Sequence, residues 1–183
     1  MKFRLLLIGL GVSLLLIAAQ KKDKGRAGSG WKKYTSKEGA FEVLMPGVPT
    51  EEKKNLQLGS GPTELNLFVV ERKKEEGAYI VAYCEFPESA LQGASPEQRL
   101  DYARSRAVSR SRGKLVGEKK IKLGSYPGRE LRFEAEGKGL VRQRLFAVKD
   151  KLYQVMVAGP KETAVSREAD KFLESFKLLP AAK

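Results

Sequence analysis

AYIVAYCEF, the sequence of residues 78–86, predicts a strand that is buried on both of its faces. Alternate side chains of a strand point to opposite faces, so Ile80 and Ala82 share one face while Tyr79 and Val81 share the other. Both sets are apolar, and strands of continuous apolar character are covered on both sides. We therefore expect this segment to lie centrally in a sheet that carries other elements on each face.

Further runs of strand character flank this segment in the chain, and turns rich in glycine, proline and asparagine separate them. The strands that we expect cover residues 31–35, 41–45, 52–58, 63–72 and 78–86 in the first half, and 115–123, 129–136, 140–149 and 152–158 in the second. Strands that follow one another through short turns pair as hairpins. The sequence therefore predicts a mostly antiparallel β-sheet.

A helix is expected between the two groups of strands. Ser95 is a suitable N-cap, Pro96 suits the first helical position, and Gln98 completes a capping box. Gly113 stands where a left-handed residue would end the helix. Apolar residues recur at helical spacing at Leu100, Ala103, Ala107 and Val108.

A second helix is expected after Pro160, from about residue 163, and its apolar stripe should pack on the sheet. The stripe consists of Val165, Ala169, Phe172, Leu173 and Phe176. Helices would then follow the fifth and the ninth strand. The predicted fold is an α+β sandwich of two or three layers, a mostly antiparallel sheet flanked by helices, in one domain over residues 31–183.

The composition limits the chemistry that this chain can perform. None of its 183 residues is histidine, which excludes a Ser-His-Asp triad, a Cys-His pair, a His-ligated zinc ion and an imidazole pH switch. Cys84 is the only cysteine, so neither an internal disulfide nor a multi-cysteine metal site can form, and we expect it to be an inert small hydrophobe. The sequence has neither a Walker pattern nor a strand-bound GxGxxG loop. We therefore expect no catalytic residue, no metal and no cofactor.

Residues 1–20 have the outline of a signal peptide or signal anchor. Two basic residues precede an apolar run of about 15 residues, which suits a signal sequence and falls short of the ~20 that span a bilayer. Small residues suit cleavage near Ala19, whereas the bulky Ile17 and the basic residues that follow favour an uncleaved anchor. A buried core helix is a third interpretation. We expect the domain to lie outside the cytoplasm, secreted, periplasmic or anchored to the cytoplasmic membrane.

The segment KKDKGRAGSG, residues 21–30, is charged, glycine-rich and free of large apolar residues, which predicts a flexible basic linker. Residues 1–30 contain six basic residues and one acidic residue, so they carry +5 of the formal net charge of +13 and leave +8 on the rest of the chain. Such a surplus attracts anionic partners, and salt weakens the attraction.

Several segments resemble one family in their order along the chain. They are WKKY (31–34), FEVLMPGVPT (41–50), SPEQRLDYARSRAV (95–108), YPGRELRF (126–133), LYQVMVAGP (152–160) and ADKFLESFKL (169–178). Together they resemble bacterial exported domains of the PsbP-like superfamily, which includes the Ran-binding Mog proteins. The resemblance implies an α/β/α sandwich and an accessory role rather than catalysis. Metal-binding histidines of photosynthetic relatives have no counterpart, because this chain has no histidine.

Arginines crowd the first predicted helix and a later strand. Arg99, Arg106 and Arg110 are spaced by seven and four residues, which places them on one helix face. Arg142 and Arg144 lie on the same face of a strand, and we expect them to extend this basic face. The face either docks an acidic partner or an anionic envelope surface, or is a solvated face paired with neighbouring carboxylates. Nucleic acid is not expected, because no aromatic residues interleave the basic ones.

These features predict a non-catalytic accessory or protein-binding domain outside the cytoplasm. Two alternatives from other classes stay open. A hydrolase of an envelope polymer would act through two carboxylates and needs a deep cleft with two facing acids. A small-ligand-binding domain needs a pocket between sheet and helix.

Overall fold

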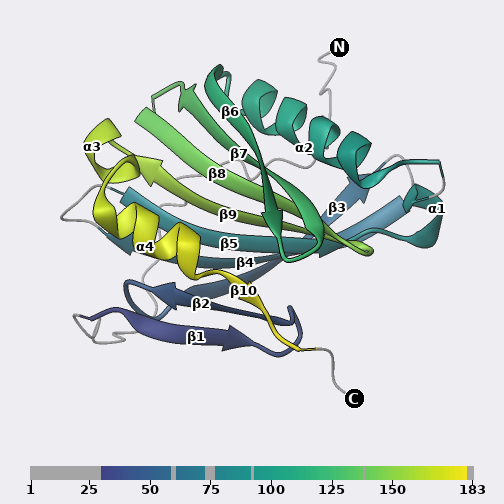
Figure 1. Ribbon diagram of the computed structural model, residues 1–183, viewed down its shortest axis with the longest axis horizontal. Helices are drawn as coiled ribbons and strands as arrows, with labels where there is room; N and C mark the ends of the chain where they lie inside the picture. The colour runs from purple at the N-terminus through teal and green to yellow at the C-terminus, as the bar shows by residue number, and fades with distance from the viewer. Residues whose placement is uncertain (1–29, 59–60, 73–76, 92, 138, 181–183) are drawn as a thin grey trace, which may run out of the picture.

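The structure is a computed structural model that describes residues 30–58, 61–72, 77–91, 93–137 and 139–180 (Figure 1). The predicted signal or anchor segment, residues 1–20, lies outside the described residues, as does the predicted linker apart from Gly30.

Seven strands form one antiparallel sheet in the order β3-β4-β5-β9-β8-β7-β6 (Figure 1). After β5 the chain crosses to the far edge at β6 and returns strand by strand until β9 pairs with β5. The predicted α+β fold with a mostly antiparallel sheet is confirmed. The strands are β3 (Thr50–Leu58), β4 (Gly61–Arg72), β5 (Gly77–Glu85), β6 (Lys114–Leu123), β7 (Tyr126–Ala135), β8 (Gly139–Val148) and β9 (Lys151–Gly159).

A second sheet of three strands, in the order β1-β2-β10, packs against one face of the large sheet. Its strands are β1 (Lys32–Ser36), β2 (Phe41–Met45) and β10 (Lys177–Leu178). The predicted hairpin of the first two strands is present, but it does not join the large sheet. The sequence did not predict β10, because two residues carry no strand pattern and only their pairing with β2 makes them a strand.

Four helices are described: α1 (Glu88–Leu91), α2 (Pro96–Arg110), α3 (Lys161–Ala164) and α4 (Arg167–Ser175). The predicted capping box of α2 is confirmed, because the Gln98 N–H donates to the Ser95 hydroxyl at 3.2 Å and the Ser95 N–H donates to the Gln98 side chain at 2.8 Å.

The end of α2 differs from the prediction. The residue with a left-handed backbone is Arg112, with φ of 48°, and not Gly113. Gly113 is needed for space instead, because a Cβ atom there would lie 2.3 Å from the carbonyl oxygen of Glu134.

The second predicted helix is interrupted. α3 ends before Val165, and α4 begins after Ser166, whose hydroxyl accepts a hydrogen bond from the Ala169 N–H at 3.1 Å. A serine side chain that bonds to a nearby backbone N–H favours the start of a new helix over continuation of the old one. Val165 was predicted to lie on the buried stripe, but it falls at this break and is exposed.

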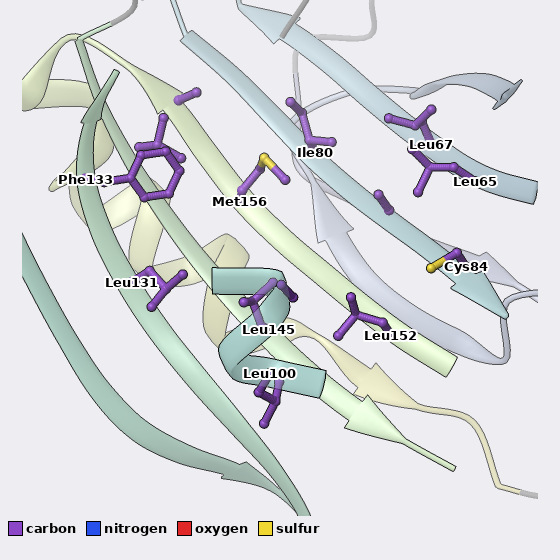
Figure 2. Close-up of a cluster of buried hydrophobic side chains, with 14 of the residues drawn as sticks. Leu65, Leu67, Ile80, Cys84, Leu100, Leu131, Phe133, Leu145, Leu152 and Met156 are labelled. Carbon is purple, nitrogen blue, oxygen red and sulfur yellow. The ribbon is translucent and has the colours of Figure 1, made fainter. Parts of the chain in front are cut away.

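α2 covers one face of the large sheet, and α4 together with the small sheet covers the other (Figure 1). α2 lies over β7 and β8, and Figure 2 shows its Leu100 beside Leu145 of β8 in one core cluster. α4 and the small sheet cover the other face, where Phe41, Phe172 and Phe176 belong to a second core cluster. Residues 77–84 of β5 are all buried, as their sequence predicts.

Gly128 on β7 leaves room for an aromatic ring of the second cluster. A Cβ atom at this position would lie 2.5 Å from Cδ1 of Phe146 and 2.6 Å from the carbonyl oxygen of Leu145. Phe146 stacks on Phe176, with ring centroids 6.0 Å apart. We expect Gly128→Ala to lower the free energy of unfolding, measured by urea denaturation, by about 1–3 kcal/mol, because it overpacks this contact.

Gly117→Ala on β6 is the matched control. The nearest atom to its added Cβ belongs to Arg132 and lies 3.8 Å away, an ordinary contact. We expect this variant to change stability by less than about 0.5 kcal/mol, and an equal loss in both variants would contradict the steric explanation for Gly128.

Candidate functional site

The structure separates the five arginines that were predicted to form one basic face. α2 carries Arg99, Arg106 and Arg110, while β8 carries Arg142 and Arg144. The residues of β8 that alternate with these two pack into the core beneath α2. Both β8 arginines therefore point to the opposite face of the sheet, where they contact α4, and they do not extend the surface of α2.

The three arginines of α2 are partly buried. Arg99 donates a hydrogen bond to the carbonyl oxygen of Lys149 at 2.8 Å, and the Arg106 guanidinium lies 5.7 Å from the centroid of the Tyr102 ring. Burial lowers the pKa of Arg99 and of Arg110, and the neighbouring charge of Arg106 lowers the pKa of Arg110 further. This helix face therefore offers less solvated charge than its sequence spacing predicts.

The two β8 arginines surround a buried carboxylate, Glu130 on β7, which is 2% exposed. Nε of Arg144 lies 2.8 Å from one carboxylate oxygen, and Nε of Arg142 lies 3.3 Å from the other. The ammonium of Lys119 and the guanidinium of Arg132 lie farther away, at 3.8 and 3.9 Å. We call this group, together with an aspartate of α4, the Glu130 cluster: Lys119, Glu130, Arg132, Arg142, Arg144 and Asp170.

The Glu130 cluster joins the sheet to α4. Arg142 contacts the Asp170 carboxylate at 2.5 Å, and Arg144 donates a hydrogen bond to the carbonyl oxygen of Leu173 at 3.0 Å. Four positive and two negative side chains leave a surplus of two positive charges. Lys119 and Arg132 carry this surplus to the solvent, because their side chains are 61% and 50% exposed.

The charges of the cluster hold its members ionised. Burial acts to raise the pKa of Glu130, but the hydrogen bond from Arg144 and the charges of Arg144, Arg142 and Lys119 hold that pKa below its ordinary value. Burial acts to lower the pKa of Arg142, yet its bonds to Asp170 and Glu130 raise it. A carboxylic acid that donates a proton near pH 7 needs a raised pKa, so Glu130 is unsuited to general acid catalysis.

Arg129, the residue before Glu130, forms a matching connection on the other face of the sheet. Its side chain is 6% exposed and forms ion pairs with Glu97 and Asp101 of α2 and with Glu118 of β6, the latter two at 3.3 Å. Burial acts to lower the pKa of Arg129, but these α2 carboxylates raise it. Arg129 thus anchors the first turns of α2 to β7.

Exposed positive charges that the sequence analysis did not single out lie along β6, an edge strand of the large sheet. The segment KLVGEKKIKL already contains them, but only the sheet order places them at an edge. We call these residues the β6 lysines: Lys114, Lys119, Lys120 and Lys122.

The β6 lysines point to both faces of the edge. Lys114 and Lys119 pair with Glu134 and Glu130 of β7 and therefore share the α4 side. Lys119 comes five positions after Lys114, an odd number, so in a regular strand the two side chains would point in opposite directions. A bulge between residues 115 and 117 brings them to one side. Lys120 and Lys122 point to the α2 side.

Cys84 is buried in β5, and burial raises the pKa of its thiol to about 12. The thiol is therefore protonated at neutral pH, and a protonated thiol is a weak nucleophile and a weak metal ligand. Within the part of the chain that the structure describes, no group of three or more acidic or cysteine side chains is placed to hold a metal ion.

The described residues define an α+β protein whose seven-stranded antiparallel sheet carries a long helix on one face and a small sheet with a second helix on the other. The solution structure of cyanobacterial PsbP (CyanoP) from Synechocystis sp. PCC 6803 matches it with a TM-score of 0.55 and 12% identity, over 87% of this chain and 98% of that protein. The crystal structure of PA94, a Pseudomonas aeruginosa protein of unknown function, matches with a TM-score of 0.41 and 12% identity, over 84% of this chain and 99% of that one.

No family model and no curated protein matches the sequence. The structural match to cyanobacterial PsbP confirms the predicted resemblance to PsbP-like proteins for the fold. An identity of 12% transfers no residue role, because one fold hosts many unrelated functions.

Glu130→Gln keeps the shape of the side chain but removes the negative charge that pairs with the buried Arg142 and the partly buried Arg144. Removing one member of a buried ion pair leaves its partner uncompensated, so we expect the free energy of unfolding at pH 7 to fall by about 3 kcal/mol in urea denaturation. The control is Glu134→Gln, on the same strand and the same face but exposed, which should change stability by less than about 0.5 kcal/mol.

The pH dependence of this loss has a defined sign. The pKa of Glu130 is lower in the folded than in the unfolded chain, so its contribution to stability is fully present above the unfolded value of about 4.3 and is lost as the pH falls through the folded value. The difference between wild type and Glu130→Gln should stay constant from about pH 7 to about pH 5 and shrink below about pH 4. A difference that persists unchanged at about pH 2 contradicts the electrostatic role.

Proposed function

We propose that this chain is a non-catalytic accessory domain that works outside the cytoplasm and docks an acidic protein partner through the β6 lysines and Arg132. The observation that carries the proposal is an edge strand whose four lysines are all exposed. The absence of histidine, the protonated Cys84 and the lowered pKa of Glu130 support a binding role over a catalytic one.

The charge of this edge is available to a partner. Among the described residues, Lys114, Lys120 and Lys122 form no ion pair, and Lys119 makes only a long one of 3.8 Å to Glu130. The positive surplus of the Glu130 cluster adjoins them. Charges of one sign on an exposed surface speed the encounter with an oppositely charged partner, and salt screens this effect.

The arrangement favours an acidic protein segment over a membrane. A flat anionic membrane that lies against one face of the sheet would contact only the lysines on that face. The β6 lysines point to both faces. A protein segment that follows the edge can contact both sets. Lysines on an edge also oppose pairing with another strand, so recognition would rest on side-chain charge rather than on strand addition.

Charge reversal of Lys120 and Lys122 to glutamate tests the docking surface. The full chain should bind immobilised poly-L-glutamate at low salt and lose this binding as salt rises. The Lys120→Glu/Lys122→Glu variant should bind roughly five- to ten-fold more weakly than wild type. The control is Lys32→Glu/Lys37→Glu, which makes the same change in net charge at two exposed residues, one at the start of β1 and one in the β1–β2 turn. Because the β6 lysines are intact in this variant, it should bind poly-L-glutamate within about two-fold of wild type.

Equal weakening in the two double variants contradicts the proposal, because net charge alone would then account for binding. A second arm measures binding to vesicles of anionic phosphatidylglycerol. If the β6 lysines matter for the vesicles and not for poly-L-glutamate, the partner is a membrane surface and the proposed acidic protein is wrong.

The location outside the cytoplasm rests on the sequence of residues 1–20, with its basic start, apolar run and small residues near Ala19. None of the helices between residues 30 and 180 that the structure describes combines the length and the apolar character needed to cross a membrane.

N-terminal sequencing of the native protein from fractionated cells tests this location. A signal peptide predicts a mature chain that begins close to residue 20 in the extracytoplasmic fraction, and a signal anchor predicts an intact chain in the membrane fraction. An intact chain in the cytosolic fraction contradicts the proposed location.

A further inference from the structure

A pocket of about 380 Å³ opens on the face of the large sheet that carries the small sheet. It lies beside the β1–β2 turn, at the end of the sheet where β4 begins and β5 ends. This volume is at the small end of the range of about 300–1,000 Å³ for ligand pockets. Its polar lining comes from Glu38, Thr63, Glu64, Asn66, Tyr83 and Glu85.

Two mostly buried polar residues, Tyr83 and Asn66, line this pocket. Tyr83 is 2% exposed, and its hydroxyl has no hydrogen-bond partner. Asn66 is 6% exposed, and its side chain forms no hydrogen bond with any other described residue. Buried polar groups in native proteins are nearly always paired, so the unpaired Tyr83 hydroxyl beside this pocket indicates a site whose partner comes from outside the chain.

Tyr153, the cross-strand neighbour of Tyr83, has a hydroxyl that is hydrogen-bonded within the protein. Tyr153 lies directly opposite Tyr83 on β9, and its hydroxyl donates a hydrogen bond to the carbonyl oxygen of Gly39 at 2.8 Å. Tyr83 has the same side chain on the same face and lacks such a bond. The two residues therefore form a natural pair for comparison.

The walls of the pocket are acidic, although the chain as a whole is basic. Lys53 bridges Glu38 and Glu64 with ion pairs of 2.9 and 3.0 Å, and Lys151 pairs with Glu85. Three carboxylates and two ammonium groups leave one negative charge. The electrostatic complement of the pocket is therefore a ligand with one positive charge.

We infer that this pocket binds a primary ammonium group, carried either by a free alkylamine or by a lysine side chain of a peptide. An ammonium has three N–H donors, which match the carboxylates, the Tyr83 hydroxyl oxygen and the Asn66 amide oxygen. The three glutamates already hold the ammonium groups of Lys53 and Lys151. A metal ion is a poorer match, because within the described parts of the chain no group of acidic side chains is placed to ligate one.

This site is independent of the proposed docking surface, because β6 lies at the opposite edge of the sheet from β3 and β4. The ligand also has the opposite sign of charge. A variant that loses ammonium binding in the pocket can therefore still be tested for binding through the β6 lysines, and the reverse also holds.

The test is an NMR titration of the full chain with n-butylammonium and with N-acetyl-lysine methylamide, following the side-chain amide of Asn66. We expect saturable shifts with a dissociation constant on the order of 1 mM or tighter for at least one probe, and the stronger of the two identifies the source of the ammonium group. Tetramethylammonium has the same charge but no N–H donor, and it should bind at least about ten-fold more weakly.

Two variants and one control place the binding in this pocket. Tyr83→Phe and Glu64→Gln should each weaken n-butylammonium binding about ten-fold, because each removes a partner of the ammonium group. Glu52→Gln, on the opposite face of β3 and paired with Lys54, should leave the dissociation constant unchanged. Absence of a saturable shift, binding of tetramethylammonium as tight as that of n-butylammonium, or equal weakening by Glu52→Gln overturns the inference.

Thermal unfolding separates a binding defect from a folding defect. The Tyr83 hydroxyl forms no bond in the free protein, so Tyr83→Phe should leave the melting temperature unchanged or raise it. Tyr153→Phe removes the bond to Gly39 and should lower it by about 2–5 °C. If Tyr83→Phe lowers the melting temperature as much as Tyr153→Phe does, the hydroxyl has a structural partner and the inference is wrong.

Discussion

Adjacent residues on β7, Arg129 and Glu130, place opposite buried charges on opposite faces of the large sheet, and each charge connects the sheet to a helix. Arg129 pairs with carboxylates of α2, while Glu130 holds Arg142 and Arg144, which reach α4. Taking charges out of water is costly, and the cost is offset only where partners are well placed. These ion pairs are therefore retained only if the helices sit where the buried side chains reach them.

This arrangement also explains why a chain rich in arginine has less free charge than its composition indicates. The buried arginines are neutralised within the fold, and the exposed surplus lies along β6 and over the Glu130 cluster. Toward the opposite edge of the sheet, beside β4, the local sign reverses, because three glutamates line a pocket there. The shared PsbP-like fold, at 12% identity, accounts for neither feature, because both depend on surface residues that a fold does not fix.

Local signals predicted much of this structure. The continuous apolar run of β5 and the capping box at Ser95 depend on neighbouring residues, and both appear as expected. What failed depends on distant parts of the chain. Strand alternation placed Arg142 and Arg144 on one face, but only tertiary packing decides which face α2 covers. Likewise, β10 is a strand only through its pairing with β2, and the bulge that reorients the β6 lysines has no sequence signal.

The closure of the small sheet has a consequence for the order of folding. β2 is made early, yet it pairs with β10, and its Leu44 N–H donates a hydrogen bond to the Ser175 hydroxyl, 131 residues away along the chain. Contacts of such long sequence separation form slowly, because the entropy of closing the loop must be met first. Until synthesis reaches these residues, the β1–β2 hairpin has an unpaired edge. A nascent chain therefore exposes this strand edge until β10 is made, and an unpaired strand edge favours aggregation.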